Sequence, residues 1–162
     1  MIATHPTVEE VWAWLEEVPD PEVPVVSVVD LGIVRDVAWH DDVLEVTVTP
    51  TYSGCPATAV IDLEIQAALR RHGVEHFKVK RQLSPAWTTD WIGDKAREKL
   101  RAFGIAPPIG AACAGALAPV EVECPRCGSP KTERISQFGS TPCKASYRCI
   151  DCLEPFDYFK VH

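Results

Sequence analysis

The chain has 162 residues, seven cysteines and a formal net charge of −7. An acidic balance excludes the broad class of sequence-independent nucleic-acid binders, which depend on Lys and Arg contacts with phosphates, and it disfavours an anionic membrane surface. No apolar run has the length of a membrane span, and the first ten residues do not resemble a signal peptide. We therefore expect a cytoplasmic protein whose cysteines serve metal or redox chemistry rather than disulfides.

The N-terminal part predicts a small α/β domain. Hydrophobic periodicity indicates a helix, two strands of a hairpin, a second helix and a third strand, at residues 8–18, 33–39, 43–49, 56–72 and 75–83. Thr7 and Glu10 have the spacing of a capping box at the first helix. Helices on one face of a mixed sheet would give a two-layer domain.

The second half predicts a change of architecture. A further helix, capped by Thr89 or Asp90, is expected to run to about Phe103. The stretch after it is rich in Gly, Ala and Pro and lacks periodicity, so we predict a linker in which Cys113 is incidental. The predicted organisation is an α/β domain, a linker and an all-β module over residues 1–104, 105–119 and 120–162.

Cys55 lies in a turn between the second predicted strand and the second predicted helix. Pro56 suits the first position of a helix because it lacks an N–H and has a fixed φ. The positive end of the helix dipole would then favour the thiolate of Cys55, the form that attacks electrophiles and binds metals. The alternative is a half-buried structural cysteine, and the local pattern leaves both interpretations open.

Three further residues are candidates for a role at the site. Asp20 and Glu22 lie in an extended, proline-interrupted stretch. Their carboxylates are expected to shape the loop by accepting backbone hydrogen bonds, with oxygen ligation or a base near a thiol as the alternative. Thr49 ends the second strand, and we expect its hydroxyl to help shape the site.

The C-terminal module carries the pattern of a zinc ribbon. Two Cys-x₂-Cys pairs, Cys124/Cys127 and Cys149/Cys152, are separated by 21 residues. Four thiolates at tetrahedral positions suit Zn²⁺, and a module of about 40 residues needs such a metal to fold. We favour zinc over a rubredoxin-like iron site or a thiol redox pair. Cys143 is a fifth thiol and the alternative ligand.

Several blocks together resemble the MIP18 (DUF59) iron–sulfur assembly family. They are Asp20-Pro21-Glu22, Asp30-Leu31-Gly32 and Thr49-Pro50-Thr51 through Cys55-Pro56. One branch of that family, PaaD of phenylacetate degradation, is similar also at residues 84–91, 138–141 and 154–159. The resemblance covers nearly the whole chain, and it makes Cys55 the family's cysteine and Asp20 the acid of its Asp-Pro-Glu segment.

The resemblance implies a maturation factor for the phenylacetyl-CoA epoxidase (monooxygenase) system, whose reductase carries a [2Fe–2S] cluster and whose oxygenase carries a di-iron site. The implied partners are the epoxidase subunits and iron–sulfur assembly proteins. Besides structural zinc, the implied cargo is a transient iron–sulfur cluster or iron held at Cys55. One cysteine cannot complete a cluster's thiolate shell, so a homodimer or a client would supply further ligands.

Two other functions remain open from the sequence. The chain could be an accessory subunit that docks on the epoxidase through its ribbon without handling metal. It could also be a small thiol enzyme with Cys55 as nucleophile and His72 or His76 as base, although both histidines fall at the far end of the helix. We expect that the chain is not an enzyme by itself.

Overall fold

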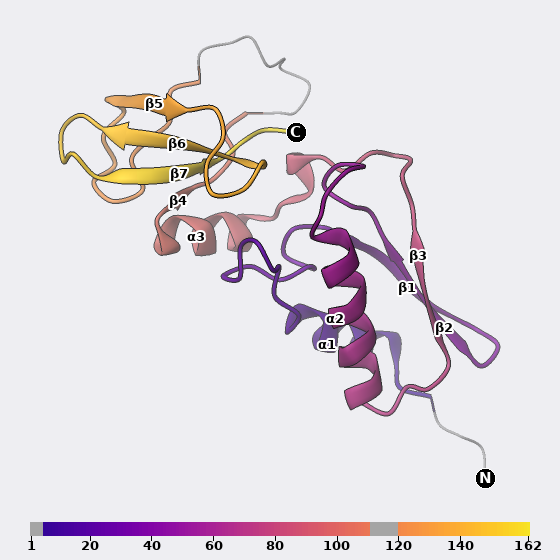
Figure 1. Ribbon diagram of the computed structural model, residues 1–162. Helices are drawn as coiled ribbons and strands as arrows, with labels where there is room; N and C mark the ends of the chain where they lie inside the picture. The colour runs from indigo at the N-terminus through magenta and orange to yellow at the C-terminus, as the bar shows by residue number, and fades with distance from the viewer. Residues whose placement is uncertain (1–4, 111–119) are drawn as a thin grey trace. The chain divides into compact units, whose positions relative to one another are not determined.

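The computed structural model describes residues 5–110 and 120–162, and the chain forms two compact units, Met1–Trp87 and Thr88–His162 (Figure 1). Cys113 and most of the predicted linker lie outside the described residues. Within the described ranges, no helix combines the length and the apolar character that crossing a lipid bilayer requires. The predicted helix before the linker groups with the C-terminal unit.

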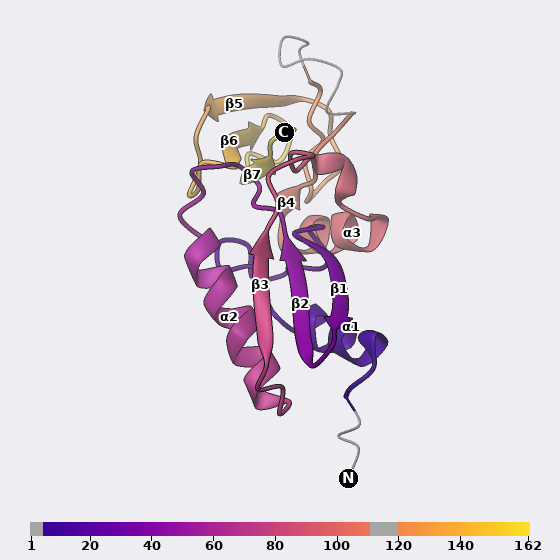
Figure 2. The same ribbon diagram turned by 90° about the vertical axis from the view of Figure 1, so that its right-hand side faces the viewer.

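The N-terminal unit contains two helices and a three-stranded mixed sheet. Its elements are α1 (Val8–Glu16), β1 (Val34–His40), β2 (Val43–Val48), α2 (Thr58–Arg71) and β3 (Phe77–Arg81). The strand order is β1-β2-β3, with β1 antiparallel and β3 parallel to β2 (Figure 2). Because parallel strands need a crossover connection, α2 links β2 to β3. Both helices lie on one face of the sheet, which confirms the predicted two-layer domain (Figure 1).

Period-two alternation in β2 produces the core of this unit. Leu44, Val46 and Val48 are almost completely buried, as the sequence pattern predicts. Helix α1 contacts β1 and α2 and buries its apolar stripe, and its N-terminus has the predicted capping box between Thr7 and Glu10. These elements hold the end of β2, and hence the turn that follows it, on a packed scaffold.

The start of α2 differs from the prediction. The helix begins at Thr58 with Ala57 as its N-cap, so Pro56 lies in the preceding turn and is not the first helical residue. The amide of Thr58 donates to the carbonyl of Cys55 at 3.2 Å, which closes one turn before the helix proper. The reason is local: Tyr52 to Cys55 already forms a turn, with Cys55 N donating to Tyr52 O at 3.1 Å.

The C-terminal unit is a four-stranded sheet preceded by short helices. It contains η1 (Thr89–Trp91), α3 (Asp94–Phe103), β4 (Ile105–Ala106), β5 (Thr132–Ser136), β6 (Lys144–Cys149) and β7 (Pro155–Phe159). The strand order is β4-β7-β6-β5, in which β6 is antiparallel to both β5 and β7. This confirms the predicted all-β ribbon.

Two predictions in this unit are wrong in detail. The helix expected from about residue 89 to Phe103 is split, because the chain is extended at Ile92 and Gly93 between η1 and α3. The predicted linker begins with a strand: β4 pairs in parallel with β7. Gly104 ends α3 in the left-handed conformation, and this sharp turn sends the chain directly into β4.

Candidate functional site

The Cys55 turn lies between β2 and α2 and presents a half-exposed side chain. Among the described residues, the Cys55 thiol makes no hydrogen bond, so its sulfur is available to an external group. Ala57, the N-cap of α2, provides no side-chain hydrogen bond to the first turn of the helix, and that turn contains no acidic residue. The partial positive charge of the helix N-terminus is therefore not neutralised by the helix itself.

Asp20 has the loop-shaping role that the sequence favours. It is 5 % exposed, and its Oδ1 accepts the backbone N–H groups of Glu22 at 2.9 Å and Val23 at 2.8 Å. Glu22 is half-buried in the turn that Asp20 fixes. Paired hydrogen bonds of this kind hold a turn in one conformation, so the carboxylate of Asp20 acts on the backbone of its own loop.

Thr49 is almost completely buried at the end of β2. Its amide donates to Ile33 O at 2.8 Å, and the residue is 1 % exposed. Its Oγ1 is buried and has no hydrogen-bond partner among the described residues. An unpaired buried hydroxyl costs free energy, so Thr49 is an unusual choice at this position unless the hydroxyl has a use.

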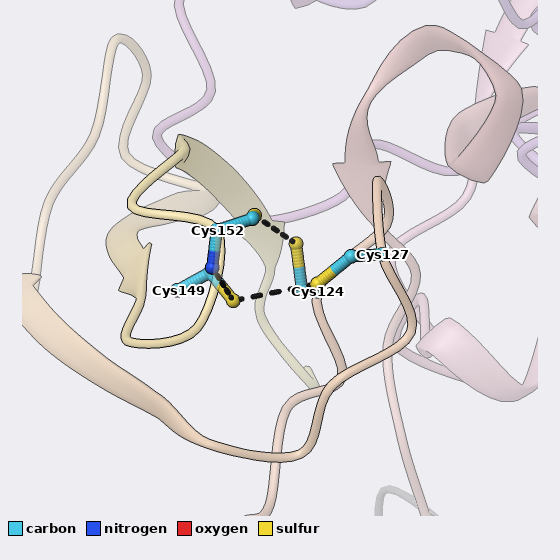
Figure 3. Close-up of side chains that lie close together, drawn as sticks. All are labelled: Cys124, Cys127, Cys149 and Cys152. Atoms are coloured by element: carbon cyan, nitrogen blue, oxygen red, sulfur yellow. Dashed lines mark hydrogen bonds between the residues drawn. The ribbon is translucent and has the colours of Figure 1, made fainter.

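The four predicted cysteines of the ribbon converge on one point. Cys124 and Cys127 come from one loop, Cys149 is the last residue of β6, and Cys152 lies in the β6–β7 loop (Figure 3). Their sulfur atoms all lie within 4.8 Å of one another, with Cys124 Sγ 3.7 Å from Cys152 Sγ and Cys127 Sγ 3.5 Å from Cys149 Sγ. Tetrahedral Zn–S bonds of about 2.3 Å place sulfurs about 3.8 Å apart. The donor set therefore fits zinc.

Two thiols of this cluster, Cys149 and Cys127, have pKa values shifted in opposite directions. A hydrogen bond from the backbone N–H of Cys152 to the Cys149 sulfur is the main cause that lowers the pKa of Cys149 to about 7. At Cys127, a backbone hydrogen bond at Ser129 lowers the pKa, but burial and the neighbouring cysteines outweigh it and raise the pKa to about 12. Mutual crowding of four thiols favours replacement of their protons by one cation.

Cys143 does not join this cluster. It is buried, and its sulfur lies 3.0 Å from Thr141 Oγ1. Among the described residues, the four ribbon cysteines are the one group of three or more His, Cys, Asp or Glu side chains close enough to share a metal ion. Cys55 therefore has no such set of ligands around it in the described part of the chain.

Sequence comparison covers both units. An iron–sulfur cluster assembly protein model matches residues 8–80, and a PaaD zinc β-ribbon domain model matches residues 112–160. The chain is 53 % identical over 155 residues to an Escherichia coli protein named as a putative subunit of 1,2-phenylacetyl-CoA epoxidase, and the match covers 96 % of this chain and 93 % of that protein. A Bacillus subtilis Fe–S protein maturation auxiliary factor is 38 % identical over 91 residues, which cover 55 % of this chain and 88 % of that protein.

Structural comparison identifies two solved structures of similar fold. A DUF59 domain of unknown function from Bacillus anthracis has a TM-score of 0.53 and 29 % identity, covering 57 % of this chain and 89 % of its own. A conserved hypothetical protein from Thermotoga maritima has a TM-score of 0.52 and 30 % identity, covering 61 % and 98 %. With both units matched in order and half the residues shared with the Escherichia coli relative, the chain belongs to the PaaD family, in which an iron–sulfur cluster assembly domain is combined with a PaaD zinc β-ribbon.

Proposed function

We propose that this chain is a maturation factor that delivers an iron–sulfur cluster or iron to the phenylacetyl-CoA epoxidase system. The observation that carries the proposal is the combination of both family domains in one chain that is 53 % identical to a putative epoxidase subunit. Relatives of its N-terminal part are named Fe–S protein maturation auxiliary factors. The same type of domain would here serve one dedicated client.

Cys55 is the proposed ligand for the cargo. Its sulfur is half-exposed and unbonded among the described residues, and the helix N-terminus beside it is uncapped by a side chain. A single thiolate fills only one position of a cluster's shell, so the remaining ligands come from a client or a second copy of the chain. Incomplete ligation suits a carrier, because a site that holds all ligands itself releases its cargo slowly.

Asp20, Glu22 and Thr49 are proposed to act around Cys55 rather than on the cargo. Asp20 fixes the loop that contains Glu22, and Thr49 anchors the end of β2 before the Cys55 turn. The buried Thr49 hydroxyl is the one group of this set with an unused hydrogen-bonding atom among the described residues. We assign it to holding the turn when cargo is present.

The ribbon is proposed to hold structural zinc at Cys124, Cys127, Cys149 and Cys152. Four thiolates leave no open position for a substrate, which is the arrangement of a structural site. Its proposed role is to fold the C-terminal unit and to present it to the epoxidase subunits. Thiols kept reduced for metal binding suit the cytoplasm, and none of the six cysteines in the described residues forms a disulfide.

The proposal is tested by producing the epoxidase subunits together with the wild-type chain, with Cys55→Ala, or with no chain. Iron and labile sulfide in the purified epoxidase subunits are then measured. We expect Cys55→Ala to reduce both to the level found without the chain, while the variant itself stays folded and zinc-loaded. Full iron and sulfide in the client with Cys55→Ala would leave docking, without metal transfer, as the function.

A further inference from the structure

The two cysteine loops of the ribbon are joined by polar contacts that involve no cysteine. Arg126 Nη1 lies 2.8 Å from Glu154 Oε2. Ser129 Oγ donates to Asp151 Oδ2 at 2.6 Å, and Lys131 Nζ lies 3.5 Å from Asp151 Oδ1. Each contact connects the segment of the first cysteine pair to the segment of the second.

These contacts follow one rule in both loops. Each loop carries a first and a second cysteine. The residue just before the second cysteine of one loop contacts a residue of the other loop, and that residue lies two positions after the second cysteine there. Arg126 precedes Cys127 and meets Glu154; Asp151 precedes Cys152 and meets Ser129. The sequence thus encodes a reciprocal pair of bridges, which we call the cross-loop clamp: Arg126–Glu154 and Asp151–Ser129.

The backbone of the two loops explains the reciprocity. Gly128 and Leu153, each directly after a second cysteine, have positive φ values of 74° and 63°. The left-handed turn at this position redirects the chain, so the next side chain faces back across the site. Leucine rarely adopts this conformation, which costs about 1–2 kcal/mol at a single residue. The second loop keeps the turn despite this cost, as expected if the turn serves to place Glu154.

We propose that the cross-loop clamp consists of positioning residues that hold the four thiolates in place and thereby set how slowly the ribbon releases its metal. Outer partners of metal ligands act in this way because they orient the ligands without touching the ion. The proposal rests on the zinc assignment and is independent of the role of Cys55.

The chain offers a matched control for this proposal. Glu133 pairs with Arg148 across β5 and β6, and its side chain is 49 % exposed, close to the 41 % of Glu154. Arg148 neighbours Cys149 in sequence, yet the pair joins two strands and not the two loops. Glu154→Gln and Glu133→Gln are therefore the same change at similar exposure, and they differ only in whether the clamp is broken.

The experiment follows zinc transfer from the full-length protein to a chromophoric chelator. We expect Glu154→Gln and Ser129→Ala each to speed release by about 3- to 10-fold, the double variant by about 10- to 100-fold, and Glu133→Gln by less than about 2-fold. Reversing the pair with Arg126→Glu and Glu154→Arg should restore release to within about 2-fold of wild type. This rescue would show that the pairing of the two charges, and not either side chain alone, sets the rate of release.

Cobalt substitution gives a second readout, because its visible bands report ligand geometry directly. We expect the double variant to broaden these bands and Glu133→Gln to leave them unchanged. Equal release rates in clamp and control variants, or failure of the reversed pair to rescue, would overturn the clamp. A wild-type chain that binds no zinc would overturn the zinc assignment as well, a result distinguishable from any failure at Cys55.

Discussion

The Cys55 turn and the ribbon cluster differ in how many cysteines each brings together. The ribbon brings four sulfurs within 4.8 Å and ties their loops together with the clamp. The turn offers one half-exposed sulfur on a packed α/β scaffold, with no further set of metal-binding side chains among the described residues. The ribbon therefore holds a complete set of four cysteine ligands, whereas the proposed cargo at Cys55 would need further ligands from a partner.

The difference in the number of ligands bears on whether a site retains its metal or transfers it. A closed tetrathiolate site retains its ion because every ligand would have to leave in turn, and outer contacts hold the ligands in place. A single thiolate can give up its cargo by one ligand exchange. The cluster that contains most of the cysteines is therefore not the better candidate for transferring cargo. The better candidate is Cys55, which has the fewest metal-binding neighbours.

The largest expected effect is at the ribbon. Cys124→Ala removes one of four ligands and should weaken zinc binding by more than about 100-fold, beyond what loss of an outer contact causes. The C-terminal unit should lose its ordered sheet, because a small metal site contributes its binding energy to folding. Zinc analysis and amide NMR check this, with Cys143→Ser as a control that keeps zinc. Loss of zinc in the control as well would break the proposed ligand set.

A mutation in the core of the N-terminal unit should have the converse effect: it should destabilise that unit and leave the ribbon unchanged. Leu44 is completely buried in β2, and Leu44→Ala should lower the free energy of unfolding of this unit by about 2–5 kcal/mol. Zinc content should stay at the wild-type level, since the ribbon has its own core and its own metal. Urea titration with signals from each unit measures both. Coupled loss of zinc would show that the two units do not behave as separate folding units.

A smaller effect is expected at Asp20. Asp20→Ala leaves the N–H groups of Glu22 and Val23 without their acceptor, and we expect a loss of about 1–3 kcal/mol in the free energy of unfolding. Asp20→Asn keeps an oxygen at the same position and should lose less. Thermal unfolding ranks the two variants. An Asn variant that is stable yet fails to mature the client would instead assign the charge of Asp20 to the cargo.

Local sequence patterns were sufficient to predict much of the fold. The alternation of Leu44, Val46 and Val48 predicted their burial, and the spacing of Thr7 and Glu10 predicted the capping box. The two Cys-x₂-Cys pairs predicted the convergence of four sulfurs. Each of these signals is carried by residues close in sequence or by a chemistry that few arrangements satisfy.

The features that the sequence did not reveal depend on distant residues. Arg97 donates to the carbonyls of Thr89, Ile92 and Pro108, so it fixes the split between η1 and α3 by contacts that no helix pattern contains. The burial of Thr49 depends on what packs against the strand end. The clamp was hidden because its partners are polar, half-buried or exposed residues that resemble an ordinary solvated surface, although their equal offsets from the cysteines were present in the sequence.

The central claim is that the ribbon retains its metal and the turn carries cargo. Anaerobic reconstitution with iron and sulfide, followed by zinc, iron and labile-sulfide assays on wild type, Cys55→Ala and Cys124→Ala, tests it most directly. We predict that Cys55→Ala loses labile sulfide and keeps zinc, and that Cys124→Ala loses zinc and keeps labile sulfide. Labile sulfide that survives Cys55→Ala and disappears with Cys124→Ala would contradict the claim.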